Sequence, residues 1–290
     1  MSENGGLTAE LARLVGDTVT ADRQVGRGHA WTLHRARMAD GREFFVKRAV
    51  GEQNPATSAI LHAEAEGLRW LHCVAAELVP PVIAVDDRIL VLPWLTTVEP
   101  NRAAAECFGT ALADLHTQAA DAYGAPWDGW IATLPQDNSM GAGEWAPWYA
   151  RHRLEPLLPA AAPVLGRPGT RLFERVVEQI DDLAGPPEPP SRIHGDLWHG
   201  NLMWTRDAVL MIDPAAHGGH RETDLAMLRL FGAPGLEHIL EAYAERFPLA
   251  PGAERRVPLH QLYPLMVHVV LFGEVYREQA VTAAERALAL

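Results

Sequence analysis

The amino-acid sequence predicts an α+β protein of two lobes: a small antiparallel β-rich lobe with one main helix over residues 1–93, and a larger helical lobe over residues 94–290. Up to about residue 93, short apolar or β-branched segments alternate with turn residues around one helical pattern. From residue 101 onward helical spacing dominates, and only two short strands interrupt it. A chain of 290 residues with 48% hydrophobic content is long enough for two lobes with cores of their own.

The elements of the first lobe are predicted from apolar spacing and turn residues. The pattern predicts a helix over 7–15, three antiparallel strands within 18–49, a helix over 58–72 and two strands within 80–95. The Asp40-Gly41 pair is a strong hairpin signal between two of these strands. A second turn is expected at Asp86-Asp87.

The second lobe is predicted to be mainly helical. The pattern predicts helices over 102–116, 171–183, 222–232, 235–247 and 259–279, and short strands within 191–196 and 208–213. The Ala- and Pro-rich stretches 157–169 and 185–190 are expected to be loops. Packing is the main role expected for four tryptophans, Trp127, Trp130, Trp145 and Trp148. Cys73 and Cys107 lie in helical apolar contexts and are expected to be buried thiols.

The stretch HGDLWHGN, residues 194–201, permits two interpretations. His194, Asp196 and His199 could bind a transition metal, because imidazole and carboxylate are its usual ligands. Alternatively, Asp196 and Asn201 have the spacing of the catalytic loop of protein kinases, with Gly195 in place of the usual arginine. In such a loop the aspartate receives the proton of the attacking hydroxyl, and the asparagine reaches a Mg²⁺ ion on the nucleotide.

Three more charged residues fit the kinase interpretation. Asp213 ends an apolar strand twelve residues after Asn201, where a phosphotransferase needs a second metal carboxylate. Lys47 lies in the apolar strand FFVK, and Glu64 lies on the helix that follows. A lysine and a glutamate in these places form the pair that anchors nucleotide phosphates. The zinc alternative, with His217 and His220 as further ligands, leaves Lys47, Glu64 and Asn201 without a role.

Two segments are candidates for nucleotide binding. Gly26 and Gly28 lie in a hairpin where a phosphate-covering loop is expected, although they do not complete a G-x-G-x-x-G motif. Pro93 and Leu95 lie at the junction of the lobes, where backbone groups could meet an adenine edge. Because proline has no N–H, Leu95 must be the donor.

Charge and targeting signals narrow the class of partner. The formal net charge of −12 and the lack of a Lys/Arg run argue against nucleic acid or an anionic membrane. The chain start resembles no signal peptide, and no apolar run approaches the length of a membrane span. We therefore expect a cytoplasmic protein that binds small molecules, with no nucleic-acid or membrane partner. The oligomeric state stays open, with a monomer favoured.

The sequence resembles the fructosamine (ketosamine) 3-kinases, which are related in fold to aminoglycoside and choline phosphotransferases. The resemblance extends from about residue 18 to 280 and rests on five stretches: FFVKRA, ALADLH, WYARHRLEPLL, HGDLWHGNLMW and IDPAAHGGHRETDLAMLRLFG. It implies a protein-kinase-like two-lobed fold. It also implies transfer of the ATP γ-phosphoryl group to the sugar 3-hydroxyl of a ketosamine, whose phosphorylated form then decomposes and frees the amine.

The resemblance also implies roles for individual residues. They are the catalytic base (Asp196), two Mg²⁺ ligands (Asn201 and Asp213), a phosphate-anchoring pair (Lys47 and Glu64), an acceptor wall (Trp198) and a structural acceptor behind the catalytic loop (Asp224). Position in the sequence, and not the resemblance, places four more residues near the acceptor, with a structural hydrogen-bonding role equally open for each: His217, His220, Arg221 and Glu222. The chain departs from the family at Pro93, where members commonly carry an acidic residue. It also lacks the cysteine that some members carry in the phosphate-covering loop.

Two alternatives remain open. One is a phosphotransferase for another hydroxylated amine, such as an aminoglycoside or a choline-like compound. The other is a catalytically silent nucleotide-binding protein on the same fold. Retention of Lys47, Glu64, Asp196, Asn201 and Asp213 together argues against the silent protein, because a silent copy has no reason to keep every charged part.

Overall fold

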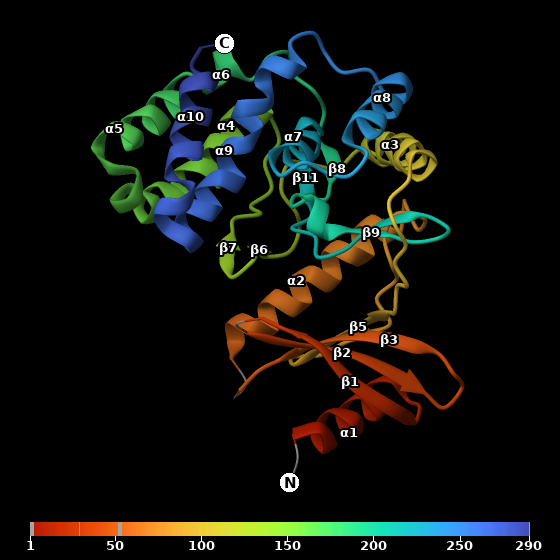
Figure 1. Ribbon diagram of the computed structural model, residues 1–290. Coiled ribbons are helices and arrows are strands. Elements are labelled where there is room, and N and C mark those ends of the chain that lie inside the picture. The colour runs from red at the N-terminus through yellow and green to blue at the C-terminus, as the bar shows by residue number, and fades with distance from the viewer. Residues whose placement is uncertain (1–2, 29, 52–53, 290) are drawn as a thin grey trace.

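The computed structural model describes residues 3–28, 30–51 and 54–289, so His29 of the predicted phosphate-covering hairpin lies outside the described residues. Figure 1 shows an antiparallel sheet lobe at the N-terminal end and a larger helical lobe. The α+β class and the kinase-like two-lobed arrangement are therefore confirmed. The lobe boundary at residue 93 stays a prediction.

The small lobe is built on a five-stranded antiparallel sheet in the order β1-β2-β3-β5-β4. Its elements are α1 (Glu3–Val15), β1 (Val19–Arg27), β2 (Trp31–Met38), β3 (Glu43–Ala49), α2 (Pro55–His72), β4 (Ala84–Val85) and β5 (Ile89–Pro93). Gly41 turns the β2–β3 hairpin with a φ of 89°, which glycine adopts without strain. Helix α1 buries Leu7 and Leu11 against the apolar side chains of β2, β3 and β5.

Helix α2 lies between the sheet and the large lobe (Figure 1). It begins after Asn54, whose side chain accepts a hydrogen bond from the Ala56 N–H, with Pro55 in its first turn. Its buried side chains, such as Leu61 and Leu68, share one apolar cluster with β5 and with elements of the large lobe. This shared core fixes the position of α2 relative to both lobes.

The large lobe is mainly helical. Its helices are α3 (Arg102–Thr117), α4 (Trp145–Tyr149), α5 (Leu158–Glu178), α6 (Ile180–Leu183), α7 (Glu222–Leu230), α8 (Leu236–Arg246), α9 (Ala253–Phe272) and α10 (Arg277–Ala287). Short strands form three pairs: β6 (Gly129–Ile131) with β7 (Leu134–Gln136), β8 (Ser191–Ile193) with β11 (His217–Gly219), and β9 (Leu202–Trp204) with β10 (Val209–Met211). Helix α9 is central, because its side chains pack with those of α4, α5 and α10 in one core.

The structure corrects three expectations from the sequence. The large lobe was expected to hold only two short strands, which correspond to β8 and β10, but its described residues also form β6, β7, β9 and β11. Most of the stretch 157–169, expected to be a loop, belongs to α5, which is interrupted at Gly166 by a φ of 67° and a ψ of 170°. Each piece of α5 carries a proline close to its start, Pro159 and Pro168, where the missing N–H costs little. Cys73 and Cys107 are exposed, not buried.

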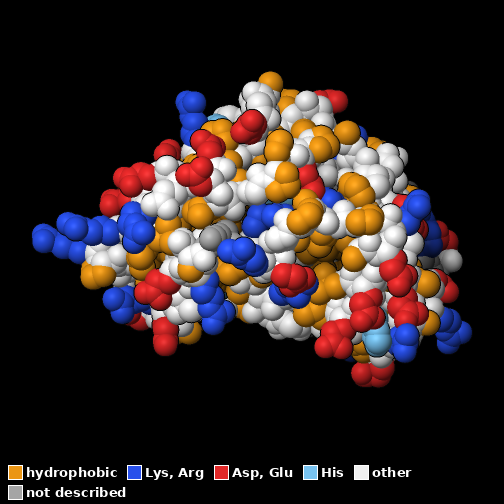
Figure 2. Space-filling model, turned by 90° about the horizontal axis from the view of Figure 1, so that it is seen from above, with side chains coloured by type: hydrophobic (Ala, Val, Ile, Leu, Met, Phe, Trp, Pro, Cys, Tyr) orange, Lys and Arg blue, Asp and Glu red, His pale blue; other side chains and the backbone are white. Residues whose placement is uncertain are grey.

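Two observations concern the surface. Figure 2 shows acidic and basic side chains interspersed with hydrophobic ones on the face seen from above. None of the helices in the described part of the chain combines the length and apolarity needed to cross a bilayer.

Candidate active site

Two adjoining cavities lie between the sheet lobe and the helical lobe. One has a volume of about 530 Å³ and is lined by Pro93 and Leu95. The other, of about 370 Å³, is lined by Gly28 and by Asp196. The two share the lining residues Leu33, Lys47, Glu64, Trp198, Asn201 and Asp213. The predicted phosphate-anchoring and Mg²⁺-binding residues therefore lie where the two cavities meet, and the predicted catalytic base, Asp196, lines the smaller cavity alone.

Lys47 joins the two lobes through its side chain. It projects from β3, a strand in the interior of the sheet, and its Nζ lies 2.7 Å from Glu64 Oε2 and 2.7 Å from Asp213 Oδ1. Burial favours the neutral amine, but the Asp213 and Glu64 carboxylates outweigh burial and raise the pKa of Lys47, so it stays charged. Burial, reinforced by the Asp213 charge, raises the pKa of Glu64 to about 8. The predicted pair is thus brought together, with Asp213 as a third member.

The loop after β8 is held by a buried carboxylate. Asp224, on α7, is 0% exposed and accepts hydrogen bonds from the backbone N–H of His194 at 2.7 Å and of Gly195 at 2.9 Å. Gly195 has a φ of 80°, and a Cβ there would overlap the carbonyl oxygen of Ala215. Only glycine fits this place, which explains why the arginine of the kinase loop is absent.

Asp196 and Asn201 lie side by side at the end of this loop. The Asn201 amide nitrogen donates to the Asp196 backbone oxygen at 2.9 Å and to its Oδ2 at 3.3 Å. The amide oxygen of Asn201 is thereby left for another partner. Burial and the Asp213 charge raise the pKa of Asp196 to about 7, against the lowering effect of the Asn201 hydrogen bond. A carboxylate with a pKa near neutrality is well suited to take up a proton.

Asp213 follows β10 in a left-handed backbone conformation, with a φ of 57°. Its side chain is 52% exposed toward the cleft. The Ile212 N–H donates to the Asn201 carbonyl at 3.0 Å, which fixes the two segments relative to each other. Asn201 and Asp213 thus offer oxygen atoms to one region, as Mg²⁺ prefers. These two side chains fit a magnesium ion better than a softer metal.

The zinc interpretation of residues 194–201 finds no support in the geometry. His194 is fully buried, its Nε2 lies 2.9 Å from the Ile212 carbonyl oxygen, and its Nδ1 accepts the Asp196 N–H. Both ring nitrogens are therefore engaged. His199 is exposed, outside this arrangement.

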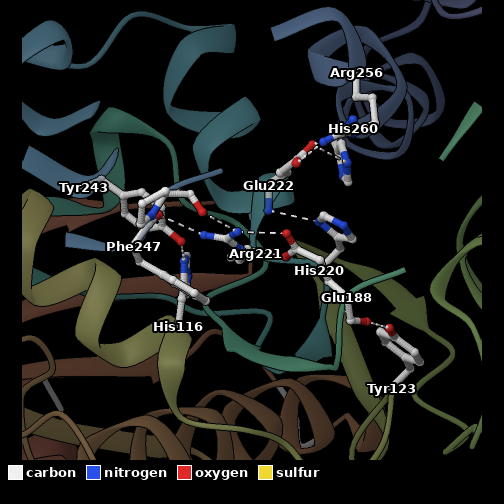
Figure 3. A network of polar contacts seen from close by, with 11 residues as sticks. His116, Tyr123, Glu188, His220, Arg221, Glu222, Tyr243, Phe247, Arg256 and His260 are labelled. Atoms are coloured by element: carbon white, nitrogen blue, oxygen red, sulfur yellow. Dashed lines mark hydrogen bonds and ion pairs between the residues drawn. The ribbon is translucent and has the colours of Figure 1, made fainter. Parts of the chain in front are cut away.

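His217, His220 and Glu222 were expected near the acceptor, with a structural hydrogen-bonding role equally open, and their contact with an acceptor stays a prediction. All three are buried and lie outside the residues that line the two cavities. Figure 3 shows Glu222 pointing toward Arg256 and His260, and the Arg256 guanidinium binds it at 2.5 and 3.0 Å. Because their neighbours come from distant elements, sequence spacing alone could not reveal this packing.

One histidine cluster has the composition of a metal site. Within the described residues, the ligand atoms of His220, Glu222 and His260 lie within 4.8 Å of one another. However, His220 Nδ1 accepts the Glu222 N–H at 3.2 Å, and Arg256 occupies the Glu222 carboxylate. In the same region, the Arg221 guanidinium donates a hydrogen bond to the Glu188 carboxylate (Figure 3). This network anchors the start of α7, which carries Asp224.

Of the remaining residues that were predicted for the site, some line a cavity and some do not. Trp198 lines both cavities, and its ring packs edge-on against Phe231. Gly26 lies within β1, where it pairs with Leu33, and it is outside the residues that line either cavity. Trp31 and Trp130 line the smaller cavity and were not predicted as site residues. The cluster of aromatic residues around position 130 was the only sequence signal for Trp130.

The fold and the site together define a kinase-like phosphotransferase. The chain superimposes on an ADP-bound aminoglycoside phosphotransferase, APH(2″)-Ib, with a TM-score of 0.66 over 98% of this chain and 97% of that one. At 16% identity this likeness concerns the fold alone.

The family follows from nearer relatives. The family model for fructosamine kinase matches residues 8–290. A Thermus thermophilus protein named "Probable ketoamine kinase" is 36% identical over 233 residues, which cover 80% of this chain and 83% of that protein. A Thermobifida fusca crystal structure described as a fructosamine-3-kinase is 46% identical, with a TM-score of 0.94 over 98% of this chain and 99% of that one. The chain belongs to the fructosamine kinase family.

Proposed function

We propose that the protein is an ATP-dependent kinase that transfers the γ-phosphoryl group to the sugar 3-hydroxyl of a ketosamine. The observation that carries this proposal is the convergence of Lys47, Glu64, Asp196, Asn201 and Asp213 on one cleft between the lobes. Phosphoryl transfer depends mainly on positioning and charge neutralisation, which such a set provides. The named relatives support a ketosamine as the acceptor.

The larger cavity takes the nucleotide. Leu95 offers a backbone N–H to the adenine edge where Pro93 cannot, and Lys47, held by Glu64, binds phosphate oxygens. Asn201 and Asp213 hold Mg²⁺, which neutralises phosphate charge when bound. Both residues line the boundary of the two cavities.

The smaller cavity takes the acceptor, because Asp196 lines it. The acceptor oxygen forms a bond to the γ-phosphorus while the bond to the β,γ-bridging oxygen breaks and ADP leaves. Asp196 accepts the hydroxyl proton in this step. Trp198 offers an apolar face to the sugar.

An acceptor panel tests this function. ADP release with Mg²⁺ and ATP is compared for a ketosamine of a simple alkylamine, an aminoglycoside and choline, and phosphorus NMR identifies the phosphorylated hydroxyl. We expect the ketosamine to give the highest kcat/KM, with phosphate on its 3-hydroxyl. A higher kcat/KM for the aminoglycoside or for choline would contradict a ketosamine acceptor and would identify that compound class as the acceptor.

A variant separates chemistry from nucleotide binding. We expect Asp196→Asn to abolish turnover while calorimetry still detects ATP binding with Mg²⁺, because the side chain keeps its size and loses only its basicity. Chelation of Mg²⁺ with EDTA should also stop turnover, and added Mg²⁺ should restore it. An active Asp196→Asn enzyme would contradict the role of this residue as base.

A further inference from the structure

One wall of the smaller cavity is formed by residues other than the predicted catalytic and phosphate-binding residues. The β6–β7 hairpin contributes residues 130–133 to its lining, and Figure 1 shows this hairpin extending from the large lobe toward α2. The remaining aromatic lining is Trp31, from β2, and Trp198, from the catalytic loop. Within the described part of the chain, no ring contact joins Trp31, Trp130 and Trp198 to one another.

Trp130 is less buried than its neighbour in the strand. Ile131 also borders the smaller cavity, but it is buried and belongs to the core of the large lobe. Trp130, opposite Pro135 in the pair, is only partly buried. A partly exposed indole that lines a cavity is available to a ligand, whereas Trp145 and Trp148 are buried in the core.

The hairpin holds a fixed position relative to the catalytic loop. The side-chain Nε2 of Gln136 donates to the Ala215 backbone carbonyl at 3.2 Å, and the Tyr263 hydroxyl donates to the side-chain Oε1 of Gln136 at 3.0 Å. Ala215 lines the same cavity and follows Asp213 by two residues. At the base, a Cβ on Gly129 would lie 2.5 Å from the Asn138 amide nitrogen, so the close packing requires glycine. These contacts make the hairpin a rigid wall.

The cavity size sets the class of acceptor. Its volume of about 370 Å³ is at the lower end of the roughly 300–1,000 Å³ typical of small-molecule sites. One sugar unit fits such a space, and the β6–β7 hairpin bounds it on one side. Flat aromatic walls suit the apolar C–H face of a sugar, and Asp196 supplies a polar group at the same cavity.

We propose that Trp130 is a specificity-determining residue for the acceptor: with Trp31 and Trp198 it forms the aromatic walls that hold one sugar unit beside Asp196. The hairpin that carries it excludes multi-ring acceptors. The inference rests on the proposed ketosamine kinase function and names the residue that selects the sugar.

Kinetics of three substitutions at one position test the inference. Trp130→Ala removes the ring, Trp130→Leu keeps an apolar side chain without a flat face, and Trp130→Phe keeps a flat face. Trp127→Phe is the matched control, because Trp127 packs edge-on against Trp70 at 5.7 Å and lies outside the residues that line the cavity. For each variant we measure the KM for the ketosamine, the KM for ATP, acceptor-independent ATP hydrolysis and the thermal unfolding midpoint.

We expect the ketosamine KM to rise about tenfold in Trp130→Ala and Trp130→Leu, as loss of one buried aromatic face predicts. Trp130→Phe should stay within about threefold of the wild type, and the ATP KM should stay within about twofold in every variant. The ratio of kcat/KM for an aminoglycoside to that for the ketosamine should increase in Trp130→Ala. A purely structural tryptophan would instead lower the unfolding midpoint and change both KM values together.

The outcomes separate this inference from the proposed function. A wild-type enzyme that phosphorylates no ketosamine overturns the proposed function and this inference with it. An active wild type with an unchanged ketosamine KM in Trp130→Ala and Trp130→Leu overturns the inference alone. The same KM increase in Trp127→Phe also overturns it, because the effect would then belong to the segment and not to the cavity wall.

Discussion

Replacement of Asp224 by asparagine is a sharp test of how the catalytic loop is held. The Asp224 carboxylate is fully buried, accepts the backbone N–H groups of His194 and Gly195, and lies 3.2 Å from His116 Nε2. Burial raises its pKa, but the His116 and His194 contacts outweigh burial and lower it, so the group is ionised at neutral pH. Asparagine has one oxygen, so its NH₂ group must face one of the two N–H donors.

The magnitude follows from these contacts. The variant loses a hydrogen bond to a charged group, which contributes about 1.5–3 kcal/mol, and leaves a buried donor unpaired at a cost of about 1–3 kcal/mol. We therefore expect a loss of about 3–5 kcal/mol, in the range for breaking a buried charged contact. For a protein of this size that corresponds to a decrease of about 10 °C in the unfolding midpoint.

The assay combines circular dichroism melting with steady-state ADP release. Either orientation of the asparagine leaves an unpaired N–H in the loop that carries Asp196, so kcat should decrease by more than the stability loss explains at 25 °C. Asp207→Asn is the control, since this exposed aspartate should tolerate the same substitution within about 1 °C. An Asp224→Asn variant that melts within 2 °C of the wild type would refute the idea that this carboxylate holds the loop.

Three further outcomes follow from other contacts. Lys47→Met leaves two carboxylates without their shared cation, and turnover should fall about 100-fold or more in steady-state assays; wild-type turnover would exclude phosphate anchoring by this lysine. Burial lowers the pKa of His217 to about 3, so between pH 6.5 and 3 the unfolded chain binds a proton that the folded one does not, and stability falls as the pH falls. At about 1.36 kcal/mol per pH unit, lowering the pH from 6.5 to 5 should reduce the free energy of unfolding by about 2 kcal/mol more in the wild type than in His217→Asn, as measured by denaturant titration. Equal losses in the two proteins would contradict the burial effect. Arg256→Gln strands the buried Glu222 carboxylate and should cost about 3–5 kcal/mol of stability with the acceptor KM unchanged. A changed acceptor KM at wild-type stability would return Glu222 to the acceptor site.

The nucleotide side of the site was predictable because local signals mark each part of it. Lys47 stands out as a charge within an apolar strand, and Asp213 stands out at the end of another. Phosphate and metal dictate these residue types, so a lysine and an aspartate in such places have few competing roles. The structure places both at the same cleft.

In the helical lobe, part of α5 and the burial of Cys107 were predicted wrongly, for physical reasons. The prolines and Gly166 of α5 are signals for a loop. Pro159 and Pro168 lie close to the start of a helical piece, where proline is tolerated, whereas Pro163 lies inside the first piece. Gly166 interrupts the helix only locally. Cys107 has buried neighbours close by along the chain, but its own position faces solvent because α3 buries one face. Single-residue burial depends on helix phase, which apolar context alone does not define.

The acceptor side was least predictable, because its residues have types with many uses. A tryptophan packs in a core as readily as it lines a cavity, and the Trp130 hairpin turns at Ala132 with a φ of 52° and no glycine to mark the turn. His217 and His220 are buried, and each has a hydrogen bond to a residue two positions away, Ala215 and Glu222. The Glu222 carboxylate is bound by a residue of a distant element, Arg256 on α9. The chemistry of phosphate therefore restricts which residue types can line the nucleotide cavity. The residues of the acceptor cavity are brought together only by the tertiary fold. It follows that substitutions in the β6–β7 hairpin should change acceptor choice in this fold without altering the residues that transfer the phosphoryl group.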